Sequence, residues 1–129
     1  MNLQKLLADR LGVYTDIRLA FLCGSFAEGR QTPASDIDIA ILFQKKPDFY
    51  YLEEIKDDLA RLVKREIDII VLNESSPIIR MQVLKKGVPL IKHDVVYADY
   101  FVSTVKEYDD LKMVRREIEA QILKGRLYA

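Results

Sequence analysis

The sequence has 129 residues, half of them hydrophobic, and its 20 basic side chains balance 20 acidic ones. This length suits one domain, residues 1–129, and the apolar content excludes a disordered chain. A net charge of zero argues against a dedicated nucleic-acid-binding protein, because such proteins usually carry a basic excess, so we expect no direct nucleic-acid binding. The N-terminus has no secretory pattern and no apolar run approaches the roughly 20 residues that span a bilayer, so we predict a cytoplasmic protein without membrane contact.

Hydrophobic periodicity predicts an α/β (α+β) chain. In the first half we expect an amphipathic helix, a buried strand, one helical turn and a second strand, at residues 3–11, 18–23, 25–29 and 37–43. The next helix is expected to open at Pro47, since proline is tolerated at a first helical position. Its apolar stripe is predicted to consist of Phe49, Leu52, Ile55, Leu59, Leu62 and Val63.

The second half continues the alternation of strands and helices. Residues 66–72 are expected to form a third strand, and a helix capped before Pro77 is expected to end at Gly87. A short fourth strand is predicted at residues 88–91. A long helix of about residues 96–124 follows. Its tail extends past anything that a small sheet can cover, which makes residues 113–129 candidates to face a partner.

Three aspartates stand on the predicted strands. Asp36 and Asp38 are two positions apart, so the alternation of side chains along a strand places both carboxylates on one face. Asp68 interrupts the apolar run Ile67-Asp-Ile-Ile-Val-Leu72. A carboxylate within such a run is costly to bury unless it is paired or bound to a metal. The pattern therefore predicts a site for divalent cations.

A glycine–serine turn is separated by ten residues from the first of these aspartates. Gly24 lets the backbone approach phosphates closely, and Ser25 with the following N–H groups offers donors to the β- and γ-phosphates of a nucleotide. Turn and carboxylates together indicate nucleotidyl transfer, in which two metal ions stabilise the attacking and leaving oxygens. Asp36 and Asp38 would bridge the metals, and Asp68 would complete the metal that activates the acceptor hydroxyl.

These motifs resemble those of the minimal nucleotidyltransferases of the DNA polymerase β superfamily, in particular the MNT antitoxins that are paired with HEPN-domain toxins. The residues that carry the resemblance are Gly24-Ser25, Ala27, Gly29, Ser35-Asp36-Ile37-Asp38, Ile67-Asp68-Ile69, Pro77, Gly87, Leu90 and Tyr108-Asp109. The resemblance covers nearly the whole chain. It implies a small mixed β-sheet flanked by helices, with a long C-terminal helix.

The resemblance also implies an activity and a partner. The expected reaction is the transfer of AMP from ATP, with Mg²⁺ (two ions), to a hydroxyl of a HEPN-family toxin, usually a tyrosine near its RNase active site. Adding AMP places bulk and negative charge at that site and neutralises the toxin, so a hetero-oligomer is expected. The chain has room for the catalytic sheet and its helices only, which favours a partner as the acceptor.

One position departs from the family pattern. Many relatives carry an arginine where this chain has Glu28, and a negative residue beside a triphosphate site would be unfavourable if it pointed inward. Two explanations are open: Arg30 compensates for the charge, or Glu28 faces solvent.

Two other functions are compatible with the sequence. The first is a non-enzymatic antitoxin that inhibits by binding alone, and the second is a small-molecule nucleotidyltransferase of the aminoglycoside-modifying kind. Among the remaining residues, Cys23 is expected to be a buried, unreactive thiol and His93 a surface residue. Arg80 and Lys85, on the helix after Asp68, are candidates to face the cleft.

Overall fold

The protein is built on a mixed β-sheet with helices on both faces. The computed structural model describes residues 2–27, 29 and 36–128. Within these residues the strands are β1 (Ile17–Cys23), β2 (Ile37–Phe43), β3 (Ile67–Val71) and β4 (Val88–Lys92). Their order across the sheet is β3-β2-β1-β4. Strand β1 runs antiparallel to β2 and β4, whereas β2 and β3 are parallel. The predicted small mixed sheet is confirmed.

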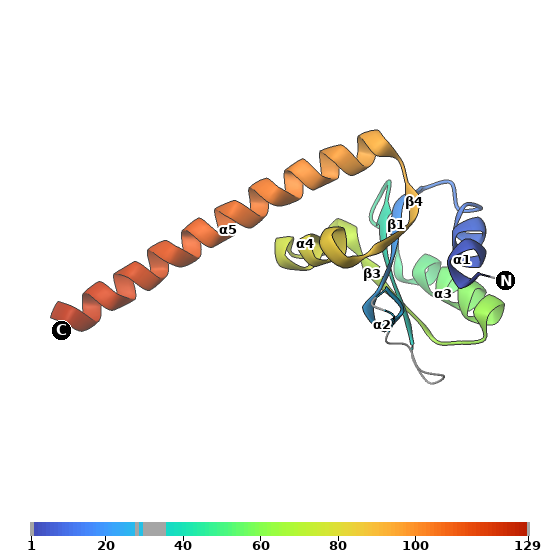
Figure 1. Cartoon of the computed structure of the whole chain (residues 1–129), viewed down its shortest axis with the longest axis horizontal. Helices are drawn as coiled ribbons and strands as arrows, with labels where there is room; N and C mark the ends of the chain where they lie inside the picture. The colour runs from blue at the N-terminus through green and yellow to red at the C-terminus, as the bar shows by residue number, and fades with distance from the viewer. Residues whose placement is uncertain (1, 28, 30–35, 129) are drawn as a thin grey trace.

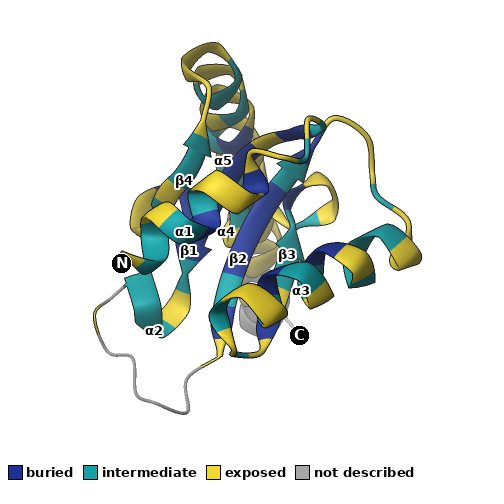
Figure 2. Ribbon diagram, turned by 90° about the vertical axis from the view of Figure 1, so that its right-hand side faces the viewer, coloured by how far each residue is buried: buried dark blue, intermediate teal, exposed yellow. Residues whose placement is uncertain are grey.

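The helices alternate with these strands along the chain. They are α1 (Leu3–Leu11), α2 (Gly24–Ala27), α3 (Phe49–Val63), α4 (Pro77–Lys86) and α5 (Asp94–Tyr128), with a short 3₁₀ turn, η1 (Leu72–Glu74). Helices α1 and α3 cover one face of the sheet, and α4 with the first turns of α5 covers the other (Figures 1 and 2).

The central strand β2 shows how the sequence produces these two layers. Its odd-numbered side chains, from Ile37 to Phe43, are fully buried against α1 and α3. Its even-numbered side chains Ala40 and Leu42 belong to the second apolar layer, which includes residues of α4 and α5. Because side chains alternate along a strand, Asp38 must lie on the same face as Ala40, beneath α4.

Some boundaries differ from the sequence-based predictions. Helix α3 begins at Phe49 rather than at Pro47, because the Asp48 side chain caps it by accepting a hydrogen bond of 2.8 Å from the Tyr51 N–H. Phe49 is 68% exposed and Leu62 is 36% exposed, so these two residues do not belong to the buried stripe. The third strand is shorter than expected, because the chain turns into η1 at Leu72.

The last helix is longer than predicted and projects away from the sheet (Figure 1). Near its start, Val96, Tyr97 and Tyr100 pack on the second apolar layer, and Thr104 is fully buried. From residue 109 to residue 123 every side chain is exposed. None of the helices in the described part of the chain combines the length and apolar character that crossing a membrane requires.

Candidate active site

The parallel pairing of β2 with β3 brings the predicted carboxylates together. Asp38 lies directly opposite Asp68 in the register of the two strands, and Cys23 of β1 lies opposite Asp38 on its other side. Asp36 comes one residue before β2 and has the same parity as Asp38. The three aspartates therefore lie at one end of the sheet, where β2 and β3 begin, and on the face that α4 covers.

The burial of these aspartates differs from the expectation. Asp38 is half-buried, but Asp36 and Asp68 are exposed. The prediction that Asp68 interrupts a buried strand was wrong because β3 is the edge strand, in which Ile67 is buried while Asp68 on the other face is exposed. Exposure leaves Asp36 and Asp68 accessible to a large molecule that approaches this end of the sheet.

The carboxylates repel one another. Burial raises the pKa of Asp38, and the negative charges of Asp68 and then Asp36 raise it further. In the described residues no three His, Cys, Asp or Glu side chains stand close enough together to form a ready metal site. The donor set nevertheless fits Mg²⁺, which takes one or two carboxylates together with phosphate oxygens and water. A divalent cation between Asp38 and its neighbours would relieve the repulsion.

The turn after β1 is shaped to approach Asp38. Gly24 has a φ of +67°, and a Cβ atom at this position would lie 2.5 Å from Oδ2 of Asp38. Only glycine satisfies both the left-handed backbone and this close approach. Gly24 and Ser25 also open α2, and the first N–H groups of a helix have no partner within it. The predicted proximity of turn and carboxylate is therefore present, whereas Glu28 and Arg30 lie outside the described residues.

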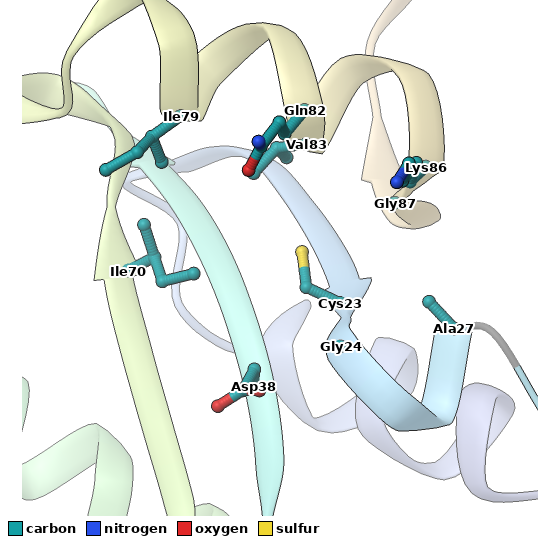
Figure 3. Close-up of a pocket in the computed structure, with 10 residues that line it drawn as sticks. All are labelled: Cys23, Gly24, Ala27, Asp38, Ile70, Ile79, Gln82, Val83, Lys86 and Gly87. Atoms are coloured by element: carbon teal, nitrogen blue, oxygen red, sulfur yellow. The ribbon is translucent and has the colours of Figure 1, made fainter. Parts of the chain in front are cut away.

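A cavity of about 340 Å³ lies between this end of the sheet and α4 (Figure 3). We call it the α4 cavity. It is lined by Cys23, Gly24, Ala27, Asp38, Ile70, Ile79, Gln82, Val83, Lys86 and Gly87. Its volume lies within the usual range for small-molecule sites, and its wall combines a carboxylate and a lysine with apolar side chains.

One basic side chain of α4 faces the cavity, and it is neither of the two candidates that the sequence left open. Lys86 lines the cavity, whereas the expected candidates Arg80 and Lys85 do not. Arg80 is held by Glu107 of α5 and lies 5.8 Å from the ring centre of Tyr100. The helical spacing of Ile79, Gln82 and Lys86 places these three side chains on one face, but the sequence does not show that this face meets the cavity.

Cys23 is half-buried and contributes its side chain to the cavity wall. Burial is the main cause that raises the pKa of its thiol to about 11. The thiol is therefore protonated at neutral pH and is a poor nucleophile, in line with the expected unreactive role.

Comparison with known proteins identifies the family. Residues 5–95 match the family described as Polymerase beta, Nucleotidyltransferase. The chain belongs to this family. Among similar nucleotidyltransferases, the protein adenylyltransferase MntA of Shewanella oneidensis is 31% identical over 117 residues, which cover 88% of this chain and 80% of MntA.

Solved structures of toxin–antitoxin proteins contain chains that superpose on this one. A crystal structure of a toxin–antitoxin with AMP-PNP contains a chain that aligns with a TM-score of 0.79 and 26% identity, covering 95% of this chain and 99% of that one. The structure of the tri-AMPylated Shewanella oneidensis HEPN toxin in complex with MNT antitoxin gives a TM-score of 0.71 at 23% identity, covering 93% and 98%. The second likeness shows the fold alone.

We expect Gly24→Ala to reduce AMP transfer about a hundredfold, because its Cβ displaces the Asp38 carboxylate from its position. Gly29→Ala is a matched control: Gly29 has a φ of +70° but no described atom within 4 Å of a Cβ placed there, so its loss should stay below about threefold. Initial rates with labelled ATP measure both. Equal losses in the two variants would show that backbone strain, and not the approach to Asp38, explains the effect.

We expect Asp38→Asn to stabilise the metal-free protein. The raised pKa means that ionised Asp38 opposes folding at neutral pH, and that this cost disappears as the pH falls through the pKa of the folded state. In EDTA at pH 7 the Tm should rise by about 2 °C, and the gain should shrink toward pH 4.

Thermal unfolding followed by circular dichroism measures this effect. Asp99→Asn removes an exposed carboxylate of α5 and should leave Tm unchanged. A fall in the Tm of Asp38→Asn in EDTA would contradict the electrostatic argument.

Proposed function

We propose that this chain is an antitoxin that transfers AMP from ATP to a tyrosine hydroxyl of a HEPN-family RNase toxin and thereby neutralises it. The observation that carries this proposal is the approach of Gly24 to Asp38, with Asp68 opposite, on a chain that matches the protein adenylyltransferase MntA over 88% of its length. Residues 1–129 would act as one catalytic domain, and a cytoplasmic location, where ATP and the toxin meet, is part of the proposal.

Each site residue has a role in this reaction. Asp36, Asp38 and Asp68 would hold two Mg²⁺ ions, whose chemistry is to stabilise negative charge on the attacking and leaving oxygens. Gly24 and Ser25 would receive the triphosphate at the first turn of α2. Asp68 would accept the proton of the acceptor hydroxyl while the oxygen forms a bond to the α-phosphorus and the bond to pyrophosphate breaks.

The exposure of the carboxylates supports a macromolecular acceptor. Asp36 and Asp68 lie at the rim of the sheet and not at the bottom of a closed cavity, so a side chain presented by another protein can reach them. The solved toxin–antitoxin with AMP-PNP, which has the same fold, supports ATP as the nucleotide. The relative MntA is a protein adenylyltransferase, which likewise favours a protein over a small molecule as the acceptor.

The projecting half of α5 is a candidate surface for holding the toxin. The face that is buried near Tyr100 and Thr104 continues along the helix as an exposed apolar stripe. The stripe consists of Leu111, Ile118 and Ile122, which are 41%, 54% and 53% exposed. Apolar side chains at this spacing are typical of a helix face that packs against a partner. This stripe also favours the second candidate, inhibition by binding alone.

A double variant separates catalysis from binding. We expect Asp36→Asn with Asp38→Asn to abolish AMP transfer to the toxin, because the carboxylates that would hold the metal ions are lost. The measurement is the intact mass of the toxin after incubation with ATP and Mg²⁺, together with toxin RNase activity.

The matched control removes two exposed charges elsewhere, Asp9→Asn with Asp99→Asn, and should transfer AMP normally. If the catalytic double variant still neutralises the toxin without a gain in mass, inhibition by binding alone is the correct function.

The role of α5 can be tested at one position of the stripe. We expect Ile118→Asp to weaken the complex with the toxin at least tenfold, because a charge enters an apolar contact. Met113→Asp is the control, since Met113 is 59% exposed on the opposite side of the same helix. Calorimetric titration gives both affinities, and equal effects of the two variants would exclude the stripe as the docking face.

A further inference from the structure

Helix α4 contributes one charged side chain, Lys86, to the cavity. The proposed reaction gives this side chain no role. Lys86 is the sole cation among the described residues that line the α4 cavity, and it stands at the last position of α4. None of the described carboxylates forms an ion pair with its ammonium group. By contrast, Arg80 is paired with Glu107 and Lys46 with Glu74.

The fold holds Lys86 next to the glycine–serine turn. Gly87, the following residue, packs so closely on β1 that a Cβ atom there would lie 3.0 Å from the Cβ of Phe21. Phe21 is in turn two residues before Cys23, which leads into Gly24. In Figure 3 the Lys86 side chain lies on the α4 wall of the cavity, on the side of Gly24 and Ala27. The end of α4 is thus anchored over the strand that leads into α2.

The charge balance of the cavity calls for a cation at this place. Asp38 lines the cavity, the charges of Asp68 and Asp36 act on it from outside the lining, and a nucleoside triphosphate adds further negative charge. Metal ions held by the aspartates would neutralise the phosphate oxygens beside them. The distal phosphates, on the side of Ser25, need a second positive group, and an ammonium on a flexible stem is a suitable donor for them.

We propose that Lys86 is a triphosphate-binding residue that contacts the β- and γ-phosphates of ATP from the α4 wall. The inference rests on the proposed function, because it takes ATP as the nucleotide of the cavity. The apolar side chains Ile70, Ile79 and Val83 then form the part of the cavity that remains for the nucleoside.

A structural role offers the competing explanation for Lys86. Cations in the last turn of a helix interact favourably with its dipole, and α4 ends with both Lys85 and Lys86. Both lysines are exposed, but only Lys86 lines the cavity. Lys85 is therefore a control matched in residue type, helix position and exposure.

The experiment measures nucleotide affinity and thermal stability of the full chain. AMP-PNP with Mg²⁺, and separately AMP with Mg²⁺, are titrated into the wild type and into Lys86→Ala, Lys85→Ala and Lys86→Arg. We expect Lys86→Ala to weaken the binding of AMP-PNP about tenfold and the binding of AMP less than twofold. Lys85→Ala should change neither affinity more than twofold, Lys86→Arg should retain most of the affinity, and both alanine variants should have similar Tm values.

Several results would overturn the assignment. Equal effects of Lys86→Ala and Lys85→Ala on AMP-PNP affinity would show that Lys86 acts only through its interaction with the dipole of α4. An equal loss of AMP and AMP-PNP affinity in Lys86→Ala would indicate damage to the cavity rather than a lost contact with the distal phosphates. If the wild type binds AMP-PNP while Lys86→Ala binds it equally well, only this inference fails. A wild type that binds no AMP-PNP refutes the proposed function as well.

Discussion

The register between β2 and β3 is the constraint on which the rest of the site depends. Because these strands are parallel and pair Asp38 with Asp68, two carboxylates from segments 30 residues apart in sequence stand side by side on one face. The antiparallel pairing of β1 adds the third component, since it brings Cys23, and hence Gly24, beside Asp38. A slip of one residue in either pairing would move a carboxylate to the face covered by α1 and α3.

That register is maintained by the apolar residues on the other face of the sheet. Ile37, Ile39 and Ile41 of β2 are fully buried, so any slip would expose a row of large side chains. At the far end of β2, the Asn73 side chain exchanges two hydrogen bonds with the backbone of Phe43, at 2.9 and 2.8 Å. The strand that carries Asp38 is thus secured along its length and at its end, while the Asp38 side chain on its other face remains partly accessible.

Much of this arrangement could be predicted from sequence because its causes are local. The alternation of side chains along β2 predicted that Asp36 and Asp38 lie on one face of the sheet. The serine before Pro77 predicted the start of α4, where the Ser76 side chain accepts a hydrogen bond of 3.3 Å from the Ile79 N–H. The exposure of the site residues could not be predicted, because it depends on which strand lies at the edge of the sheet. The exposure of Asp68 follows from the position of β3 in the sheet, and sequence does not state strand order.

The place of Lys86 in the cavity could not be predicted for a similar reason. Helix α4 is buried through Met81, Val83 and Leu84, while the equally apolar Ile78 and Ile79 are 43% and 42% exposed. With apolar residues on nearly every side, the helix shows no dominant face in sequence, and the choice between its basic residues stayed open. Only the packing of α4 on the sheet determines its rotation, and that packing turns Lys86 toward the cavity.

The junction of α4 with α5 gives the projecting helix a mechanical property. Arg80 of α4 forms an ion pair with Glu107, and the Tyr100 hydroxyl donates a hydrogen bond of 3.1 Å to the carbonyl of Leu72 in η1, so the base of α5 is attached to both elements. At 1.5 Å per residue, Ile122 stands roughly 27 Å beyond the buried Thr104. A tilt of about 10° at this base would move the tip by roughly 5 Å. A partner that docks on the exposed stripe would therefore be held at a distance from the catalytic end of the sheet that depends on the angle of α5.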